Sequence, residues 1–224
     1  GEGDFFGIVG ESGSGKSTLG RVICGLLKPD SGELKIHDTS VYASRSGRKN
    51  LQKRLSVVFQ DYTTSANPRF RVKEIIAEGL AARERNQKIR LNRAEETSRL
   101  LELVGLNASY ADRYPHELSG GQLQRVCIAR AVACQPEIIL FDEAISSLDA
   151  HTQVQIMDLL RELKEKLGLT YIFITHDLTS VTYLCDEVLF LYHGRITEHI
   201  PVSRIAETKD EYAKKLLASI IEFD

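Results

Sequence analysis

The stretch "GIVGESGSGKSTLG", residues 7–20, joins an apolar run to a turn rich in glycine and serine and then to Lys-Ser-Thr. The apolar run predicts a strand, and "KSTLGRVICGLL" after the turn predicts a helix. Such a turn lets successive backbone N–H groups converge on phosphate oxygens, and the helix N-terminus adds partial positive charge. The spacing G-x-x-x-x-G-K-[ST] is met by Gly10, Gly15, Lys16 and Ser17. The segment therefore predicts a loop that holds a nucleotide triphosphate.

The residues of this loop have separate expected roles. We expect Lys16 to reach the β- and γ-phosphates and the Ser17 hydroxyl to ligate Mg²⁺. The other positions offer backbone N–H groups and small side chains to the phosphates. The residues predicted to bind the nucleotide here are Gly10, Ser12, Gly13, Ser14, Gly15, Lys16, Ser17 and Thr18.

A second segment, "EIILFDEAISSLD", ends an apolar run with two adjacent acids, Asp142 and Glu143. Ligands of open α/β sheets bind at the carboxyl ends of the strands, so both carboxylates should lie beside the phosphate loop. Asp142 suits a water-mediated Mg²⁺ role, and Glu143 suits a general base that polarises the attacking water. A strand that runs into a helix N-terminus also favours an acid, but the phosphate loop favours the catalytic interpretation.

Three further polar residues follow apolar runs. Gln60 ends "LSVVFQ", His176 ends "YIFITH", and Asp149 closes "SSLD". Strand ends that converge on one sheet edge are where γ-phosphate sensors lie, although ordinary polar residues also occur there. Asp149 is equally typical of a helix N-cap.

Composition limits the classes of protein to consider. The chain has 224 residues, 42% of them hydrophobic, which is enough for one large domain. A formal charge of −2 gives no global basic field for nucleic acid, although a local basic patch is compatible with it. No apolar run approaches the ~18 residues of a membrane span, and no leader is visible. We therefore expect a soluble chain that acts at membranes through a partner.

Alternation of short β-like runs with helical stretches predicts an α/β core. The runs "DFFGIV", "LSVVF", "EIILF", "TYIFIT" and "EVLFLY" are too short for helices, and several are apolar on both faces, as in a covered parallel sheet. The stretch "AHTQVQIMDLLRELKEKLG" shows helical spacing. Its predicted apolar stripe is Val154, Met157, Leu160, Leu163 and Leu167.

The middle of the chain lacks the β signal. Amphipathic helical spacing takes over, with "ARERNQKIRLNRAEETSR" as an expected surface turn between helices, and "EYAKKLLASI" predicts a helix near the end. We predict a single domain over 1–224. Its α/β catalytic core comprises 1–60 and 123–224, and an all-helical subdomain comprises 61–122.

A second glycine pair, in "ELSGGQLQRVCIARA", precedes another predicted helix. By the same reasoning its N-terminus could receive an anion. One nucleotide does not need two phosphate loops, so either the chain binds two anions or this loop serves a nucleotide held by another molecule. Local spacing does not choose between them.

Taken together, these motifs resemble those of an ATP-binding-cassette ATPase. "GESGSGKST", "FQD", "LSGGQLQR", "IILFDEA", "SSLD" and "ITHD" occur in that family's order and span essentially the whole chain. The resemblance implies a P-loop NTPase (RecA-like) core with a mainly parallel sheet and an inserted helical subdomain. It also implies ATP and Mg²⁺ as the bound species, with metal contacts from Ser17, Gln60 and Asp142.

The resemblance further implies that two cassettes dimerise head to tail. The signature residues of one copy then close over ATP bound to the other; they are Ser119, Gly120, Gly121 and Gln122. Gln60 becomes the Q-loop residue coupling Mg²⁺ and water to the membrane partner, His176 the switch histidine on the γ-phosphate, and Asp149 part of the D-loop. The expected catalytic residues are Lys16, Gln60, Glu143 and His176.

Within the family, "VVFQDYTTSANPRFRVKEII" and "PHELSGGQLQRVCIARAV" look most like ATPases of oligopeptide, dipeptide and nickel importers, and "DEAISSLD" leans towards the nickel type. The family's N-terminal β-region, with its adenine-stacking aromatic, is expected to be missing, because only nine residues precede Gly10. We therefore expect the ATPase subunit of a bacterial importer for peptides, nickel or a metal chelate. It would be peripheral on the cytoplasmic membrane face, with a second cassette, permease subunits and, indirectly, a substrate-binding protein as partners.

Two other functions were weighed. A cassette ATPase acting on nucleic acid or ribosomes would carry a long coiled coil between the Q-loop and the signature, or two cassettes in one chain. The interval from Gln60 to Leu118 is too short for the first, and one cassette is present. A catalytically dead regulatory cassette is disfavoured because Lys16, Asp142, Glu143 and His176 are all present. The cargo, and whether the pair is homo- or heterodimeric, are not determined by these residues.

Overall fold

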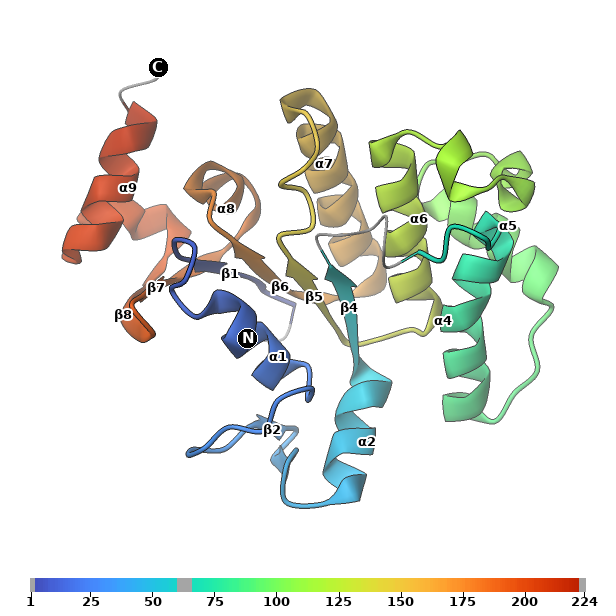
Figure 1. The fold of residues 1–224 in the computed structure, drawn as a ribbon, viewed down its shortest axis with the longest axis horizontal. Coiled ribbons are helices and arrows are strands. Elements are labelled where there is room, and N and C mark those ends of the chain that lie inside the picture. Colours follow the sequence, from blue (N-terminus) through green and yellow to red (C-terminus); the bar gives the residue numbers. More distant parts are fainter. Residues whose placement is uncertain (1–2, 60–65, 222–224) are drawn as a thin grey trace.

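A six-stranded sheet forms the centre of the computed structural model, which describes residues 3–59 and 66–221 (Figure 1). The strand order is β4-β5-β6-β1-β7-β8, in which β8 alone runs antiparallel to its neighbour. The strands are β1 (Phe5–Val9), β4 (Leu55–Phe59), β5 (Ile138–Asp142), β6 (Thr170–Thr175), β7 (Glu187–Tyr192) and β8 (Arg195–Pro201). All five predicted runs are strands, so the predicted mainly parallel sheet is confirmed.

Helices cover both faces of this sheet. The helices in the described residues are α1 (Lys16–Ile23), α2 (Arg45–Arg54), α4 (Val72–Gln87), α5 (Arg93–Leu103), α6 (Gly120–Ala133), α7 (Ala150–Leu167), α8 (Leu178–Leu184) and α9 (Glu211–Ile221), of which α4 and α5 pack against α6 and each other. On one face Ile8, Leu140 and Ile174 pack with residues of α1. The alternate strand residues join the larger core with α6, α7 and α8. The two-faced burial explains why the central runs are apolar throughout.

The described part of the segment between β4 and β5 contains helices and turns and no strand. It contains α4, α5, two 3₁₀ turns (Ala108–Asp112 and Pro115–Glu117) and α6. α6 packs against α4 and α5 and also contacts β4 and α7. Because one continuous hydrophobic core runs from α4 through α6 to the sheet, we propose that 61–122 is a subdomain of a single domain. Gln60 lies outside the described residues.

Two details of the predicted helices were wrong. Val154 and Leu167, assigned to the buried stripe of α7, are 42% and 40% exposed, whereas Ile156 and Leu159, which were not assigned to it, are buried together with Met157, Leu160 and Leu163. The charged stretch expected as a turn is mostly helix: its first residues end α4 and its last residues begin α5, leaving only 88–92 between them. The predicted C-terminal helix is confirmed as α9.

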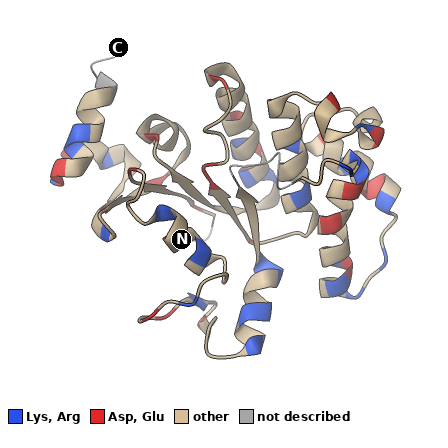
Figure 2. Ribbon diagram, in the orientation of Figure 1, with Lys and Arg blue, Asp and Glu red and all other residues tan. Residues whose placement is uncertain are grey.

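Four of the elements in the structure, β2, β3, α2 and β8, were not predicted from the sequence. The hairpin of β2 (Lys35–Ile36) and β3 (Thr39–Ser40) has strands of two residues each. α2 is strongly polar and buries only Gly47 and Leu51, and β8 is mostly exposed. α2 also carries five Lys or Arg and no acid (Figure 2). It enters the amino end of β4, so this local basic patch lies at the opposite sheet edge from the carboxyl ends of the strands.

Candidate functional site

The turn between β1 and α1 is built from glycines for steric reasons. Gly13 and Gly15 have φ of 81° and 103°, which L side chains rarely adopt. A Cβ on Gly10 would stand 2.5 Å from the Leu191 carbonyl oxygen. The turn is also held by the Gly194 N–H, which donates to the Ser14 carbonyl at 2.8 Å. The loop is thus clamped between α1 and the β7–β8 turn.

Lys16 begins α1 and turns back over this loop. Its Nζ donates to the Gly10 carbonyl at 2.5 Å and to the Glu11 carbonyl at 2.8 Å, and the residue is 7% exposed. Burial lowers the pKa of Lys16, while Glu143, Asp142 and Glu11 act in the opposite direction. A buried cation next to backbone N–H groups provides a place for an anion.

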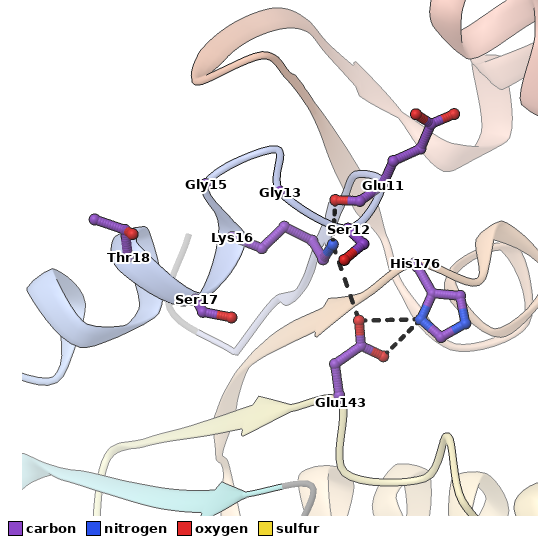
Figure 3. A pocket seen from close by; sticks show the side chains of 9 residues that line it. All are labelled: Glu11, Ser12, Gly13, Gly15, Lys16, Ser17, Thr18, Glu143 and His176. Atoms are coloured by element: carbon purple, nitrogen blue, oxygen red, sulfur yellow. Dashed lines mark hydrogen bonds and ion pairs between the residues drawn. The ribbon is translucent and has the colours of Figure 1, made fainter.

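A cavity of about 680 Å³ opens beside Lys16 (Figure 3). Its lining comes from the loop, from the end of β5 and from the end of β6: Glu11, Ser12, Gly13, Gly15, Lys16, Ser17, Thr18, Glu143 and His176. Glu11 is the one residue of this lining that was not predicted from the sequence to bind the nucleotide or to act in catalysis. The Ser14 hydroxyl is buried without a hydrogen-bond partner in the described part of the chain. The serine and threonine hydroxyls and the backbone N–H groups of this lining suit a phosphate group, which accepts hydrogen bonds from such donors. Ser14, also predicted to bind the nucleotide, is not among the lining residues.

Glu143 lies at the floor of this cavity in a left-handed conformation, with φ of 51°. Its N–H donates to the Ile174 carbonyl at 2.8 Å, which fixes the turn after β5 to β6. Its carboxylate lies 3.0 Å from His176 Nδ1, 3.5 Å from the donating Thr175 hydroxyl, and 4.0 Å from Lys16 Nζ. The sequence indicated Glu143 and His176 but not Thr175, which reads as an ordinary strand residue.

Asp142 is the last residue of β5 and lies beside α1, with its Oδ2 3.9 Å from the place a Cβ on Gly20 would take. Burial raises the pKa of Asp142, and Glu143 acts in the same direction, while Lys16 and Arg21 oppose the rise. Two adjacent carboxylates in a half-buried site are destabilising unless a cation lies near them. Asp142 and the Ser17 hydroxyl remain the predicted oxygen ligands of Mg²⁺; Ser17 lines the cavity, and Asp142 precedes the lining residue Glu143.

No group of three or more His, Cys, Asp or Glu side chains that could hold a metal exists within residues 3–59 and 66–221. Mg²⁺ generally binds through one or two protein oxygens together with substrate phosphates. The third predicted ligand, Gln60, lies outside the described residues.

The second glycine pair begins α6 and does not line the phosphate cavity. Ser119 caps the helix: its hydroxyl accepts from Gln122 N–H at 3.2 Å, and Gln122 Oε1 accepts from Ser119 N–H at 3.0 Å. Gln122 Nε2 also donates to the Tyr110 hydroxyl at 3.1 Å. Ser119, Gly121 and Gln122 line a different cavity of about 420 Å³, and Gly120 is the first residue of α6.

Asp149 is the N-cap of α7, as one of the two interpretations predicted. Its carboxylate accepts from the Thr152 N–H at 2.9 Å and from the Thr152 hydroxyl at 2.6 Å. These hydrogen bonds lower the pKa of Asp149. The structure thus brings together Lys16, Ser17, Glu143 and His176, and leaves Asp149 and the signature residues away from that cavity.

A parallel sheet with a glycine-rich loop, a buried lysine and paired acids at its carboxyl edge defines a P-loop nucleoside triphosphatase. A model of the ABC transporter family matches residues 1–146. The chain belongs to that family.

Curated relatives agree over most of the chain. The metal-staphylopine import system ATP-binding protein CntF of Staphylococcus aureus is 45% identical over 96% of this chain and 84% of its own length. The oligopeptide transport ATP-binding protein OppF of Bacillus subtilis is 44% identical over 98% and 72%.

Solved structures match as well. CbiO1 of Clostridium perfringens, part of the ABC transporter complex cbiONQ, superposes with a TM-score of 0.81 at 27% identity and covers 99% of this chain and 84% of its own. The cassette MJ0796, a post-hydrolysis dimer bound to ADP and Pi, gives a TM-score of 0.76 at 32% identity over 90% and 87%. The protein is an ATP-binding subunit of this family, which uses ATP with Mg²⁺ and hydrolyses it.

No helix among the described residues is long and apolar enough to cross a membrane.

Proposed function

We propose that this chain is the ATPase subunit of a bacterial importer for peptides, nickel or a metal chelate. It works as one of two cassettes, homo- or heterodimeric, on the cytoplasmic face of the membrane. Two ATP molecules join the cassettes, their closure moves the permease, and hydrolysis separates them. The names of the relatives, which concern oligopeptides and metal-staphylopine, support this class of cargo.

The observation that carries the proposal is the separation of the two glycine-rich corners. One cavity holds Lys16, Glu143 and His176, whereas the corner with Ser119 and Gly121 lines another. A helix N-terminus capped by Ser119, with no acid in its first turn, suits an anion. A facing cassette would supply that anion as the γ-phosphate of its own ATP.

Within the phosphate cavity each residue takes one role. Lys16 neutralises the β- and γ-phosphates, and Ser17 and Asp142 hold Mg²⁺, with Gln60 as the third expected ligand. Glu143 accepts the proton of the attacking water, and His176, within 3.0–3.1 Å of both Glu143 oxygens, orients this carboxylate and contacts the γ-phosphate. The remaining loop residues bind the phosphates, and Asp149 faces the opposite cassette.

The test is reconstitution with the candidate permease and binding protein in vesicles. We expect ATP-dependent uptake of an oligopeptide, of Ni²⁺ or of a metal chelate, and loss of that uptake with Glu143→Gln. ATP hydrolysis by a chain that binds no permease would contradict the transport role. Retention of ATPase activity together with tight binding to RNA would support the nucleic-acid alternative instead.

A further inference from the structure

Thr152, in the first turn of α7, contacts two segments that the proposed function presents to the facing cassette. Its hydroxyl donates to Asp149 Oδ2 at 2.6 Å, and its N–H donates to Asp149 Oδ1 at 2.9 Å. Its methyl group lies against Gly121: a Cβ on that glycine would stand 2.5 Å from Thr152 Cγ2. The single side chain therefore touches the end of the "SSLD" segment and the glycine pair of α6.

These contacts fix the Thr152 side chain. A β-branched residue in a helix has few χ1 states, and here the hydroxyl and the methyl group are each committed to a different segment. The two segments are themselves rigid, because Asp149 is a helix cap and Ser119 and Gln122 form a reciprocal capping box. Thr152 thus joins two capped helix ends.

We propose that Thr152 is a positioning residue that sets the place of Gly121 relative to Asp149. Gly121 lacks a side chain so that α6 can approach the Thr152 methyl group. The two segments would then meet a facing cassette as one preformed surface. This inference rests on the proposed function for its consequence, although the packing itself does not.

The competing explanation is that Gly121 must be glycine only because a phosphate of the facing cassette approaches its backbone. The two explanations differ in one respect. If Thr152 is the obstacle, removing its Cγ2 makes room for a Cβ at position 121. If the phosphate is the obstacle, no change at Thr152 helps.

The experiment places Gly121→Ala, alone and with Thr152→Ser or Thr152→Val, in a Glu143→Gln chain. Thr152→Ser removes the obstructing methyl group and keeps the hydroxyl that bonds Asp149. Thr152→Val keeps the methyl group and removes the hydroxyl, so it is the matched control. Two quantities are measured: the melting temperature without nucleotide, and the ATP concentration for half-maximal association by light scattering, with the sister cassette added if the pair is heteromeric.

We expect Gly121→Ala to lower the melting temperature by about 2–8 °C, as overpacking does in a chain of this size. It should raise the ATP concentration for half-maximal association by about tenfold or more. Thr152→Ser should restore most of both losses, whereas Thr152→Val should restore neither.

Equal behaviour of the serine and valine double variants would overturn the inference, as would rescue of neither quantity by serine. If the Glu143→Gln parent never associates, the proposed function fails, and the melting temperatures alone still decide the packing claim. If it associates and serine does not rescue, the inference fails while the proposed function stands.

Discussion

The backbone conformation of Glu143 determines where its carboxylate lies in the phosphate cavity. Its left-handed backbone would cost a non-glycine residue about 1–3 kcal/mol, yet the N–H bond to Ile174 holds it there. The turn brings the carboxylate to within 4.0 Å of Lys16 and 3.0 Å of His176. A general base at this point has both the cation and the orienting imidazole at hand.

Glu143→Gln should therefore lower the ATPase rate by about 10²–10⁴-fold, the usual contribution of a general base. ATP affinity should be retained, because the phosphate loop is untouched. Lys16→Ala is the contrasting variant and should lose ATP affinity as well as turnover. Steady-state hydrolysis together with equilibrium nucleotide binding separates the two. Unchanged turnover in Glu143→Gln would remove this residue as the base.

A buried hydroxyl gives a second prediction at this scale. Tyr171 is fully buried, its OH has no partner among the described residues, and burial raises its pKa. Its ring packs against Phe5 and Phe141 with centroids 4.5 and 5.2 Å away. Tyr171→Phe keeps the rings and removes the unpaired group, so the free energy of unfolding should stay the same or rise by about 1 kcal/mol.

Tyr42→Phe is the matched control, measured by the same denaturant titration. The Tyr42 hydroxyl lies 2.6 Å from the Val22 carbonyl and 2.5 Å from the Leu27 carbonyl. Its removal loses these hydrogen bonds and should cost about 1 kcal/mol. A larger loss from Tyr171→Phe than from Tyr42→Phe would show that the Tyr171 hydroxyl has a partner after all.

At the scale of elements, α4 and α6 approach closely at Gly79. A Cβ there would stand 2.2 Å from the Arg130 carbonyl oxygen and 2.8 Å from the Ala133 Cβ. Gly79→Ala should therefore destabilise the protein by about 1–3 kcal/mol through overpacking, despite the better helix propensity of alanine. Thermal unfolding measures this, with Ser98→Ala at a partly exposed position of α5 as the control. A stabilised Gly79→Ala variant would show that the two helices can separate without cost.

A carboxylate links β1, the start of β7 and α7, so we expect its contribution to stability to depend on pH. Asp186 Oδ2 accepts from Phe5 N–H at 2.8 Å and from Lys164 Nζ at 2.7 Å. Burial acts to raise its pKa, but these hydrogen bonds outweigh burial and hold the pKa below the usual 3.8. A carboxyl with a depressed folded pKa contributes stability above its unfolded pKa, and this stability is lost as pH falls through the folded pKa.

Asp186→Asn should thus destabilise most at neutral pH, and less as pH falls through the depressed folded pKa of Asp186. Because this side chain is 54% exposed, solvent screening limits the neutral-pH effect to about 0.5–1 kcal/mol. Denaturant titrations of both proteins at several pH values check it. A difference that stays constant from pH 7 to pH 3 would assign the effect to packing instead of charge.

What the sequence predicted follows from how each element is buried. Strands apolar on both faces could be recognised because no other short element has that pattern. α2 could not, since it buries only Gly47 and Leu51, although its Ser44 cap was a usable signal. The predicted buried stripe of α7 included Val154 and Leu167 and missed Ile156 and Leu159, because spacing alone does not tell which residues of a helix contact the core.

The site divides in the same way. Gly10, Gly15 and Lys16 could be predicted because backbone geometry demands those residue types at that spacing. Glu11, Thr175 and Thr152 could not, because they act through a backbone carbonyl, a lone hydroxyl and a methyl contact that many residue types provide. The roles of all these site residues, including those of Gln60 and Asp149, remain predictions.

On the scale of the whole molecule, one core joins the helical segment to the sheet. The phosphate loop, residues 10–17, and the signature residues, 119–122, therefore belong to the same rigid domain. The signature residues can close over a nucleotide only if that nucleotide is bound to a second cassette. We therefore propose that each ATP lies between Lys16 of one cassette and residues 119–121 of the facing cassette.

The most direct test is the mass of the Glu143→Gln chain in solution by light scattering, with ATP and Mg²⁺ and then without nucleotide. We expect ATP to double the mass, either because two copies of this chain associate or because the chain associates with its sister cassette. Lys16→Ala should abolish this doubling. A Glu143→Gln chain that binds ATP and yet keeps the mass of one cassette at high concentration, with the sister cassette present, would contradict it.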